Sequence, residues 1–204
     1  MPYQHFVNRL QGLACLAGPL VSLLAALAFL AGQPALEGVL GYYGMLLYIP
    51  LYLAVARVIG RRLPAYGAVC VSLGLFAGAA GPLAMAMRVI YVALLRAEVP
   101  AAVSAKHFDA ALEALFLGHP EFVAIGLLGL LWPVGHILNG IGLLRLGGAT
   151  RWSGVLLIAG GVSFFAAQAL AIGLPVFYPL AMALLLAGAA PLGWQLLKGE
   201  PVQR

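Results

Sequence analysis

Apolar stretches without charged residues recur along the whole chain, separated by short intervals rich in polar residues, glycine or proline. A transmembrane helix needs about 20 mainly apolar residues to cross a hydrocarbon core of about 30 Å. The stretches reach this length, and they predict an all-α, polytopic membrane helix bundle in a single domain, residues 1–204, with about six transmembrane helices. The predicted spans are residues 10–31, 38–59, 64–87, 122–144, 152–172 and 175–197.

The interval between the third and fourth spans has a different pattern. Apolar residues recur at i, i+4, i+7 and i+8 from Phe108, and charged residues recur at i, i+3 and i+7 from Lys106. This spacing predicts an amphipathic helix at residues 104–117, which ends before Gly118 and Pro120. Its apolar face would lie on the outer membrane surface or cap the bundle.

The composition excludes a soluble domain. Apolar and aromatic residues make up 64% of the chain, only 8% of the residues are charged, and the mean hydropathy is +1.04. So few charges cannot cover the surface of a soluble protein of this size, so the expected surroundings are a lipid bilayer. The net charge of +5 does not indicate nucleic-acid binding, because the basic residues lie at the ends of apolar segments and form no patch interleaved with aromatic residues.

The basic residues also predict the orientation of the chain. With six spans, most of the 11 Lys and Arg residues fall on the side of the two termini. The residues on that side are Arg9, Arg57, Arg61, Arg62, Arg145, Arg151, Lys198 and Arg204. The positive-inside rule therefore predicts a multi-pass protein of a bacterial cytoplasmic (inner) membrane with both termini in the cytoplasm.

His136 and Asn139 are the polar residues that most need an explanation. They lie within the fourth span, three residues apart and so on one helical face. Polar side chains at such a depth are costly unless they meet a partner or a wet cavity. The pair is interpreted either as a position for a ligand, a proton or a haem, or as side chains bonded to neighbouring backbone.

Three further polar residues are candidates for ligand binding or for burial in the bundle. Gln168 in the fifth span suits a hydrogen bond between helices. Tyr48 and Tyr52 share a face of the second span. The favoured interpretation of these tyrosines is a place in an interfacial aromatic belt, as for Tyr42 and Tyr43.

Arg88 lies near the predicted outer end of the third span. We expect it to snorkel to the surface or to pair with an outer cluster of carboxylates, and the alternative is that it binds an anionic ligand. The outer cluster consists of Glu37, Asp109, Glu113 and Glu121. Its spacing matches no strong metal-binding motif, so no metal ligands are predicted.

Proline and glycine bear on the packing of the spans. Pro19, Pro50, Pro82 and Pro133 each lie well inside one of the first four spans, where a proline kinks a helix. Four kinked helices could enclose a cavity, although proline is also more frequent in membrane helices than in soluble ones. The G-x-x-x-G step at residues 74–78 predicts close helix packing inside the protein, with a dimer interface as the alternative.

One stretch resembles a known class of proteins. The residues Trp132-Pro133-Val134-Gly135-His136, continued through Leu144-Arg145 to Trp152-Ser153-Gly154-Val155, resemble uncharacterised bacterial six-helix membrane proteins, a class of domains of unknown function. The resemblance covers about thirty residues. It implies a six-helix membrane fold, and it implies no activity and no site residue.

No motif in the spans predicts catalysis, since nucleophile-elbow, zinc-protease, phosphate-loop and paired-carboxylate patterns are all missing. No catalytic residue is assigned, and the cofactor is left unknown. The first functional hypothesis is a non-enzymatic subunit or scaffold of a membrane complex, with other membrane subunits or a second copy of the chain as partners. The alternatives are a small-solute transporter or its substrate-binding component, and a membrane redox protein or enzyme that uses His136.

Overall fold

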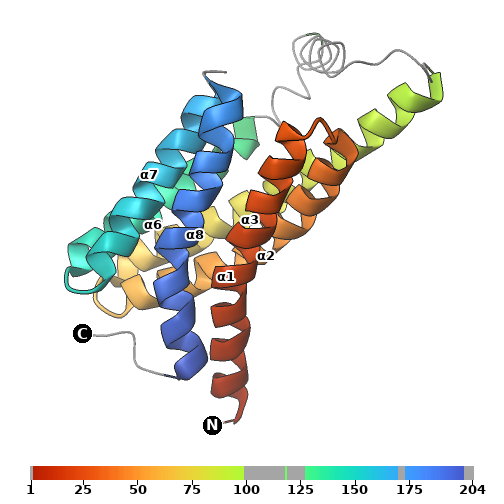
Figure 1. The fold of residues 1–204 in the computed structure, drawn as a ribbon. Coiled ribbons are helices and arrows are strands. Elements are labelled where there is room, and N and C mark those ends of the chain that lie inside the picture. The colour runs from red at the N-terminus through yellow and green to blue at the C-terminus, as the bar shows by residue number, and fades with distance from the viewer. Residues whose placement is uncertain (1, 99–117, 119–126, 170–172, 200–204) are drawn as a thin grey trace.

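The computed structural model describes residues 2–98, 118, 127–169 and 173–199 (Figure 1). Within these residues the chain forms six long helices and no strand, which confirms the all-α prediction. Six helical segments of the described chain are long and apolar enough to cross a membrane, and the fourth of these segments is Leu127–Leu146. The helices are α1 (Pro2–Leu30), α2 (Pro34–Gly60), α3 (Pro64–Glu98), α6 (Leu131–Leu146), α7 (Thr150–Ala169) and α8 (Leu174–Lys198). The amphipathic helix predicted at residues 104–117 lies outside the described residues.

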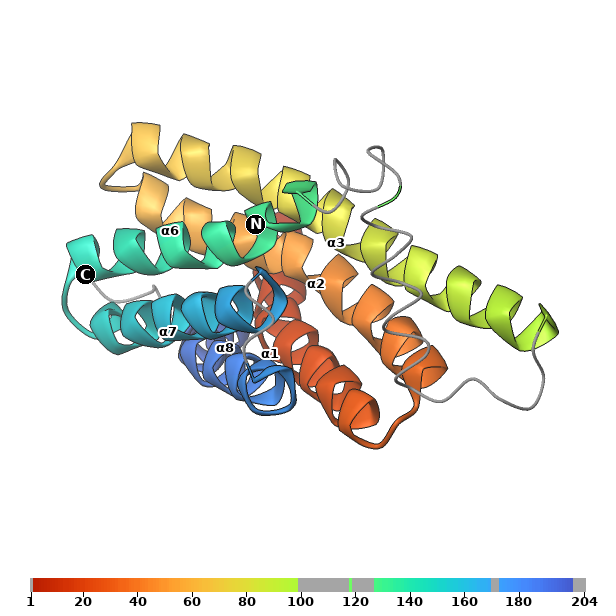
Figure 2. The same ribbon diagram turned by 90° about the horizontal axis from the view of Figure 1, so that it is seen from above.

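The helices pack as a closed ring. Consecutive helices are neighbours, α3 lies against α6, and α1 lies against α8 (Figure 2). Helix α2 also reaches α6 across the ring, which brings the second and fourth spans of the chain into direct contact. This contact between helices far apart in the sequence builds the centre of the molecule.

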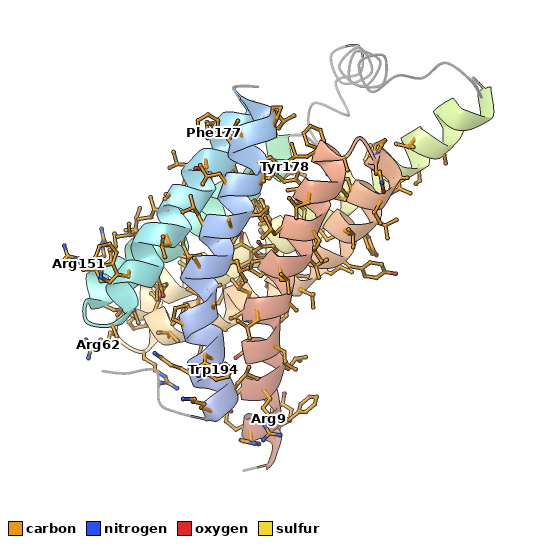
Figure 3. The ribbon with its side chains drawn as sticks, in the orientation of Figure 1. Arg9, Arg62, Arg151, Phe177, Tyr178 and Trp194 are labelled. Carbon is orange, nitrogen blue, oxygen red and sulfur yellow. The ribbon has the colours of Figure 1, made fainter. Side chains whose placement is uncertain are left out.

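The two ends of the bundle differ in charge. Both termini lie at the end that carries the α2–α3 and α6–α7 connections (Figure 1). Arg9, Arg62 and Arg151 lie at this end, whereas Phe177 and Tyr178 lie at the opposite end (Figure 3). An even number of spans accounts for the shared location of the termini. We refer to the end with the termini as the arginine-rich end.

Several helices extend beyond the spans predicted from hydropathy. Helix α1 begins at Pro2 and α3 continues to Glu98. Hydropathy identifies the part of a helix that suits hydrocarbon, and the helical backbone can continue into the polar region beyond it. The fourth span differs in another way, because a turn at Leu130 precedes α6.

The helix around Pro133 is interrupted. Residues 127–129 are helical, Leu130 forms a turn, and Pro133 is the third residue of α6. Proline lacks the backbone N–H that would bond the carbonyl group four residues earlier, so the interruption lies where Pro133 removes a helical hydrogen bond. Pro19, Pro50 and Pro82 lie inside helices. Helix α8 contains two more internal prolines, Pro179 and Pro191. The set of internally placed prolines is therefore not confined to the first half of the bundle.

Glycines of α3 accept side chains of α2. A Cβ atom at Gly74 would lie 2.6 Å from Cβ of Tyr52, and one at Gly78 would overlap Ile49. The G-x-x-x-G step thus packs inside the protein, as the sequence predicts, and the large side chains of α2 fill the space that the glycines leave.

Helices α6 and α7 make a still closer contact, between glycines on both sides. A Cβ atom at Gly140 would lie 2.6 Å from the carbonyl oxygen of Gly154, and one at Gly154 would lie 2.7 Å from the carbonyl oxygen of Gly140. Gly12 of α1 and Gly193 of α8 approach each other in the same way, with 2.8 Å in each direction. Backbone-to-backbone contacts of this kind leave no room for a side chain.

A loop of three residues, Gly147-Gly148-Ala149, joins α6 to α7. Gly147 and Gly148 have φ values of 73° and 58°, a left-handed conformation that glycine adopts without a steric penalty. The Thr150 hydroxyl donates a hydrogen bond of 2.8 Å to the carbonyl oxygen of Gly147. This bond satisfies a carbonyl group at the end of α6, where the helix provides no partner.

Candidate functional site

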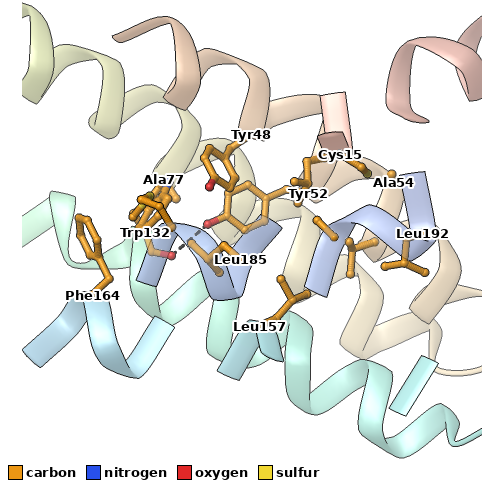
Figure 4. Close-up of a cluster of buried hydrophobic side chains, with 14 of the residues drawn as sticks. Cys15, Tyr48, Tyr52, Ala54, Ala77, Trp132, Leu157, Phe164, Leu185 and Leu192 are labelled. Carbon is orange, nitrogen blue, oxygen red and sulfur yellow. Dashed lines mark hydrogen bonds between the residues drawn. The ribbon is translucent and has the colours of Figure 1, made fainter. Parts of the chain in front are cut away.

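The centre of the bundle is a cluster of aromatic and polar side chains from α2 and α6. Tyr48 and Tyr52 lie one turn apart on α2 and are 0% and 1% exposed. The Tyr52 hydroxyl donates a 2.9 Å hydrogen bond to the backbone carbonyl oxygen of Trp132 (Figure 4). Gly135 leaves space for the Tyr52 ring, because a Cβ atom there would lie 3.2 Å from ring atom Cε1. Tyr52 thus fastens α2 to α6.

His136 lies at the middle of this cluster and is 0% exposed. Three aromatic rings surround its imidazole, with centroid separations of 4.4 Å to Trp132, 4.9 Å to Tyr52 and 5.0 Å to Tyr48. Helix α7 closes the other side, where a Cβ atom at Gly161 would lie 3.3 Å from Cβ of His136. The residue also lies near the middle of the 20-residue apolar segment Leu127–Leu146. The imidazole is therefore held far from either polar end of the span.

Polar atoms in this cluster lack protein partners. In the described part of the chain, neither ring nitrogen of His136 has a hydrogen-bond partner, and neither do the amide oxygen and nitrogen of Asn139 or the indole Nε1 of Trp132. Trp132, His136 and Asn139 are spaced at i, i+4 and i+7, which places them on one face of α6. Leaving a buried polar group without a hydrogen bond costs about 1–3 kcal/mol. Five such atoms on one helical face are a large unfavourable contribution in a protein interior.

A second buried polar group lies on α1. Ser22 is 3% exposed, and neither its hydroxyl nor that of Tyr48 has a hydrogen-bond partner among the described residues. Ser22 packs against Gly44, one turn from Tyr48 on α2. The polar character of the cluster therefore extends from α6 across α2 to α1.

An array of aromatic rings leads from the cluster toward α8 and α1. The Trp132 ring lies 4.5 Å from the Phe164 ring of α7, and Phe164 lies 5.9 Å from Tyr178 of α8. Tyr178 in turn lies 5.9 Å from Phe29 of α1. Side chains of five helices thus surround the central region, and the array approaches the end opposite the arginine-rich end (Figure 3).

The structure brings together four of the residues predicted from the sequence, Tyr48, Tyr52, His136 and Asn139. The sequence favours a place for Tyr48 and Tyr52 in an interfacial aromatic belt, but the structure buries both side chains. The belt position suits Tyr43 instead, because its side chain is 59% exposed. The sequence of α2 does not predict this burial. A spacing of four residues places Tyr48 and Tyr52 on one helical face, but it does not show whether that face points to lipid or to the interior. The difference depends on how α2 is rotated toward α6.

Sequence reasoning missed Trp132, Phe164 and Tyr178 as members of the cluster. The spacing of Trp132, one turn before His136, is a signal that could have indicated the first of them. Phe164 and Tyr178 lie on other helices and give no comparable local signal. Their membership depends on the packing of α7 and α8.

The remaining predicted residues lie elsewhere or are only partly described. The backbones of Arg88 and Gln168 belong to α3 and α7, but the structure does not describe their side chains. Glu37 lies in the first turn of α2 and is 3% exposed, about three turns from Tyr48. The other members of the outer carboxylate cluster, Asp109, Glu113 and Glu121, lie outside the described residues.

No group of three or more His, Cys, Asp and Glu side chains gathers among the residues that the structure describes. Cys15 and Cys70 are both buried and unpaired. The side chains of the central cluster offer hydrogen-bond donors, hydrogen-bond acceptors and aromatic faces.

Comparison with known proteins adds no relative. No protein-family model matches the chain, and neither a curated protein nor a solved structure gives a match. The resemblance of residues 132–161 to bacterial six-helix membrane proteins of unknown function accordingly stays a prediction.

Proposed function

We propose that this multi-pass membrane protein binds a small, neutral, polar molecule at the cluster around His136, as a carrier or as the substrate-binding component of one. The observation that carries the proposal is the set of buried polar atoms without protein partners on Trp132, His136 and Asn139. Polar groups deep in a membrane protein are expensive, and a binding site is the common reason for their presence. A ligand that satisfies these atoms would recover the cost of burying them.

The side chains favour a neutral ligand with both donor and acceptor groups. A neutral imidazole has one donor and one acceptor, a carboxamide has two donors and an acceptor, and an indole has one donor. His136, Asn139 and Trp132 supply these groups on one face of α6. No side chain described in the cluster carries a formal charge, so a charged ligand would have no counter-ion there.

The aromatic side chains provide the rest of the surface. Tyr48, Tyr52 and Phe164 present rings toward the Trp132–His136 pair, with centroid separations of 4.5–5.0 Å. Binding sites for small molecules typically combine such apolar walls with a few directed polar groups. A small planar or cyclic molecule with polar edges would match the chemistry of these side chains, with ring faces for the aromatic walls and donors and acceptors for the polar atoms.

The other two functional hypotheses gain less from the geometry. Large apolar side chains are exposed on five of the six helices, all except α6, and this surface suits lipid as well as a neighbouring subunit. The exposed apolar surface therefore does not favour a scaffold role over simple contact with lipid. A redox role for His136 would require a bound cofactor. The side chains around the imidazole are the aromatic rings of Tyr48, Tyr52 and Trp132.

Identification of the small molecules that co-purify with the protein tests the proposal. The full chain would be extracted gently from native membranes, and the molecules it retains would be released and identified by mass spectrometry. We expect a retained molecule in the wild type and its loss in His136→Leu and Asn139→Leu. Gln11→Leu is the matched control, because Gln11 is also buried and has a side-chain oxygen without a partner, but lies on α1.

Two results would overturn the proposed function. One is a wild-type protein that retains no small molecule above the amount found in an unrelated membrane protein purified in parallel. The other is equal retention by all four proteins, which would place the binding site away from the α6 face.

A further inference from the structure

The arginine-rich end of the bundle holds every basic side chain that the structure describes. Helix ends and loops contribute these residues, and Figure 3 shows three of them at this end. The set is Arg9, Arg57, Arg61, Arg62, Arg145, Arg151 and Lys198. Four of them, Arg61, Arg62, Arg145 and Arg151, come from the α2–α3 and α6–α7 connections and the helix ends beside them.

Three contacts hold these two connections against each other. The Arg62 Nη1 atom lies 3.5 Å from the carbonyl oxygen of Leu146, at the end of α6. The Arg145 guanidinium lies over the Tyr66 ring, 5.4 Å from its centroid. The Tyr66 hydroxyl donates a 2.7 Å hydrogen bond to the carbonyl oxygen of Leu138. The first turn of α3 is thereby fixed to α6, and Arg62 and Arg145 both lie at this junction.

The four arginines keep most of their hydrogen-bonding capacity. All four side chains are exposed, and a guanidinium has five N–H donors. In the described part of the chain the single carboxylate with a described side chain, Glu37, lies at the opposite end of α2. Arg57 differs, since its Nη2 atom donates a 2.8 Å hydrogen bond to the Asn8 side chain. The charge of the four exposed arginines is not offset by a described acidic group.

We propose that Arg61, Arg62, Arg145 and Arg151 bind the phosphate group of an anionic phospholipid in the leaflet that this end of the bundle reaches. The planar guanidinium matches a phosphate with two parallel hydrogen bonds, and clusters of basic residues between transmembrane helices recognise acidic headgroups. The proposal is independent of the function proposed for the central cluster.

The apolar surroundings fit a lipid rather than a soluble phosphate. Trp152, next to Arg151, is 74% exposed, and an indole at the end of a span suits the headgroup level of a bilayer. One turn deeper than the start of α3, Val69 is 51% exposed, and Phe76 two turns beyond it is 64% exposed. An acyl chain could lie along this face of α3 while the headgroup remains at the arginines.

Native mass spectrometry of the purified full chain, titrated with phosphatidylglycerol or phosphatidylcholine, tests this site. We expect wild type to bind phosphatidylglycerol in preference to phosphatidylcholine. Arg62→Gln combined with Arg145→Gln should weaken phosphatidylglycerol binding about tenfold or more, because hydrogen bonds to charged groups contribute about 1.5–3 kcal/mol each. The control is Arg9→Gln combined with Lys198→Gln, which removes the same charge from the same end and should leave binding nearly unchanged.

A second variant separates charge from geometry and guards against misfolding. Arg62→Lys combined with Arg145→Lys keeps the charge and loses the planar fork, so its affinity for phosphatidylglycerol should lie between wild type and the double glutamine variant. Equal weakening in the two glutamine pairs would overturn the site, since it would indicate general surface charge. Displacement of the lipid by soluble glycerol phosphate at equal concentration would overturn the assignment to a lipid.

Discussion

At the scale of single residues, Tyr52 and Asn139 lie on facing helices and are equally buried, but their polar atoms differ in an important respect. The Tyr52 hydroxyl has a carbonyl acceptor on α6, and the Asn139 carboxamide has no protein partner among the described residues. One side chain therefore contributes to the contact between α2 and α6, and the other costs stability. Substitutions of the two should have opposite effects on stability in the absence of a ligand.

Asn139→Leu should raise the thermal stability of protein stripped of small molecules, because it replaces an unpartnered amide with an apolar side chain of similar size. Tyr52→Phe should lower stability by about 0.6 kcal/mol, the average contribution of an interhelical hydrogen bond in a membrane protein. Thermal denaturation in detergent measures both changes. A loss of stability in both variants would mean that Asn139 has a partner within the protein.

The expected pairing of Arg88 with an outer carboxylate can be tested with Glu37. Helix α3 runs beside the start of α2, since a Cβ atom at Gly38 would overlap the side chain of Val89. Arg88→Glu alone should destabilise the protein, because it places two carboxylates at this end, and Glu37→Arg in the same chain should restore much of the stability. Double-mutant analysis of thermal denaturation provides the measurement. If the second change gives no recovery, Arg88 has another partner or snorkels to the surface.

At the scale of helices, the ring is held together by contacts in which glycine allows close approach. Helix α3 accepts side chains of α2 at Gly74 and Gly78, whereas α6 and α7 meet backbone to backbone at Gly140 and Gly154. At Gly78 the nearest atom is Cγ1 of Ile49, which can move when the side chain rotates. The carbonyl oxygens at Gly140 and Gly154 cannot move in this way, because they belong to the backbone itself.

Gly140→Ala should therefore destabilise the protein by about 1–3 kcal/mol, the usual cost of overpacking. The control is Gly129→Ala, since a Cβ atom at Gly129 would meet nothing within 4 Å. This control should be neutral or slightly stabilising, because alanine favours a helix more than glycine does. Thermal denaturation of both variants gives the comparison, and similar effects would show that α6 and α7 can move apart without cost.

At the scale of the whole molecule, the distribution of charge gives the bundle two different ends. Every described basic side chain lies at the end with the termini. The positive-inside rule predicts that this end faces the cytoplasm. Four of these basic residues also form the proposed lipid site. The same arginines would thus orient the chain during insertion and bind a lipid headgroup in the folded protein.

Thiol labelling in intact cells tests the orientation. Cys15 and Cys70 would first be replaced by alanine, and single cysteines would be introduced as Gln33→Cys and Arg62→Cys, two exposed positions at opposite ends of α2. A membrane-impermeant thiol reagent should label position 33 in intact cells and position 62 only after permeabilisation. The reverse pattern would contradict the predicted orientation.

The amino-acid sequence by itself determined that the chain is surrounded by lipid, that its fold is all-α, and approximately where its six spans lie. These properties depend on how each local segment partitions between water and hydrocarbon, so they can be read one stretch at a time. It also identified His136 and Asn139 as polar residues on one face of a span, because helical spacing is local as well. The exact start of α6 escaped this reasoning, since a turn at Leu130 leaves the hydropathy unchanged.

Only the tertiary structure decided which residues surround His136. Whether Tyr48 and Tyr52 face lipid or the interior depends on the rotation of α2, and Phe164 and Tyr178 reach the cluster only because α7 and α8 close the ring. The meeting of the Arg62 and Arg145 connections likewise depends on the packing of α3 on α6. Contacts between helices arise from the shapes of distant segments, and no local pattern along the chain specifies them.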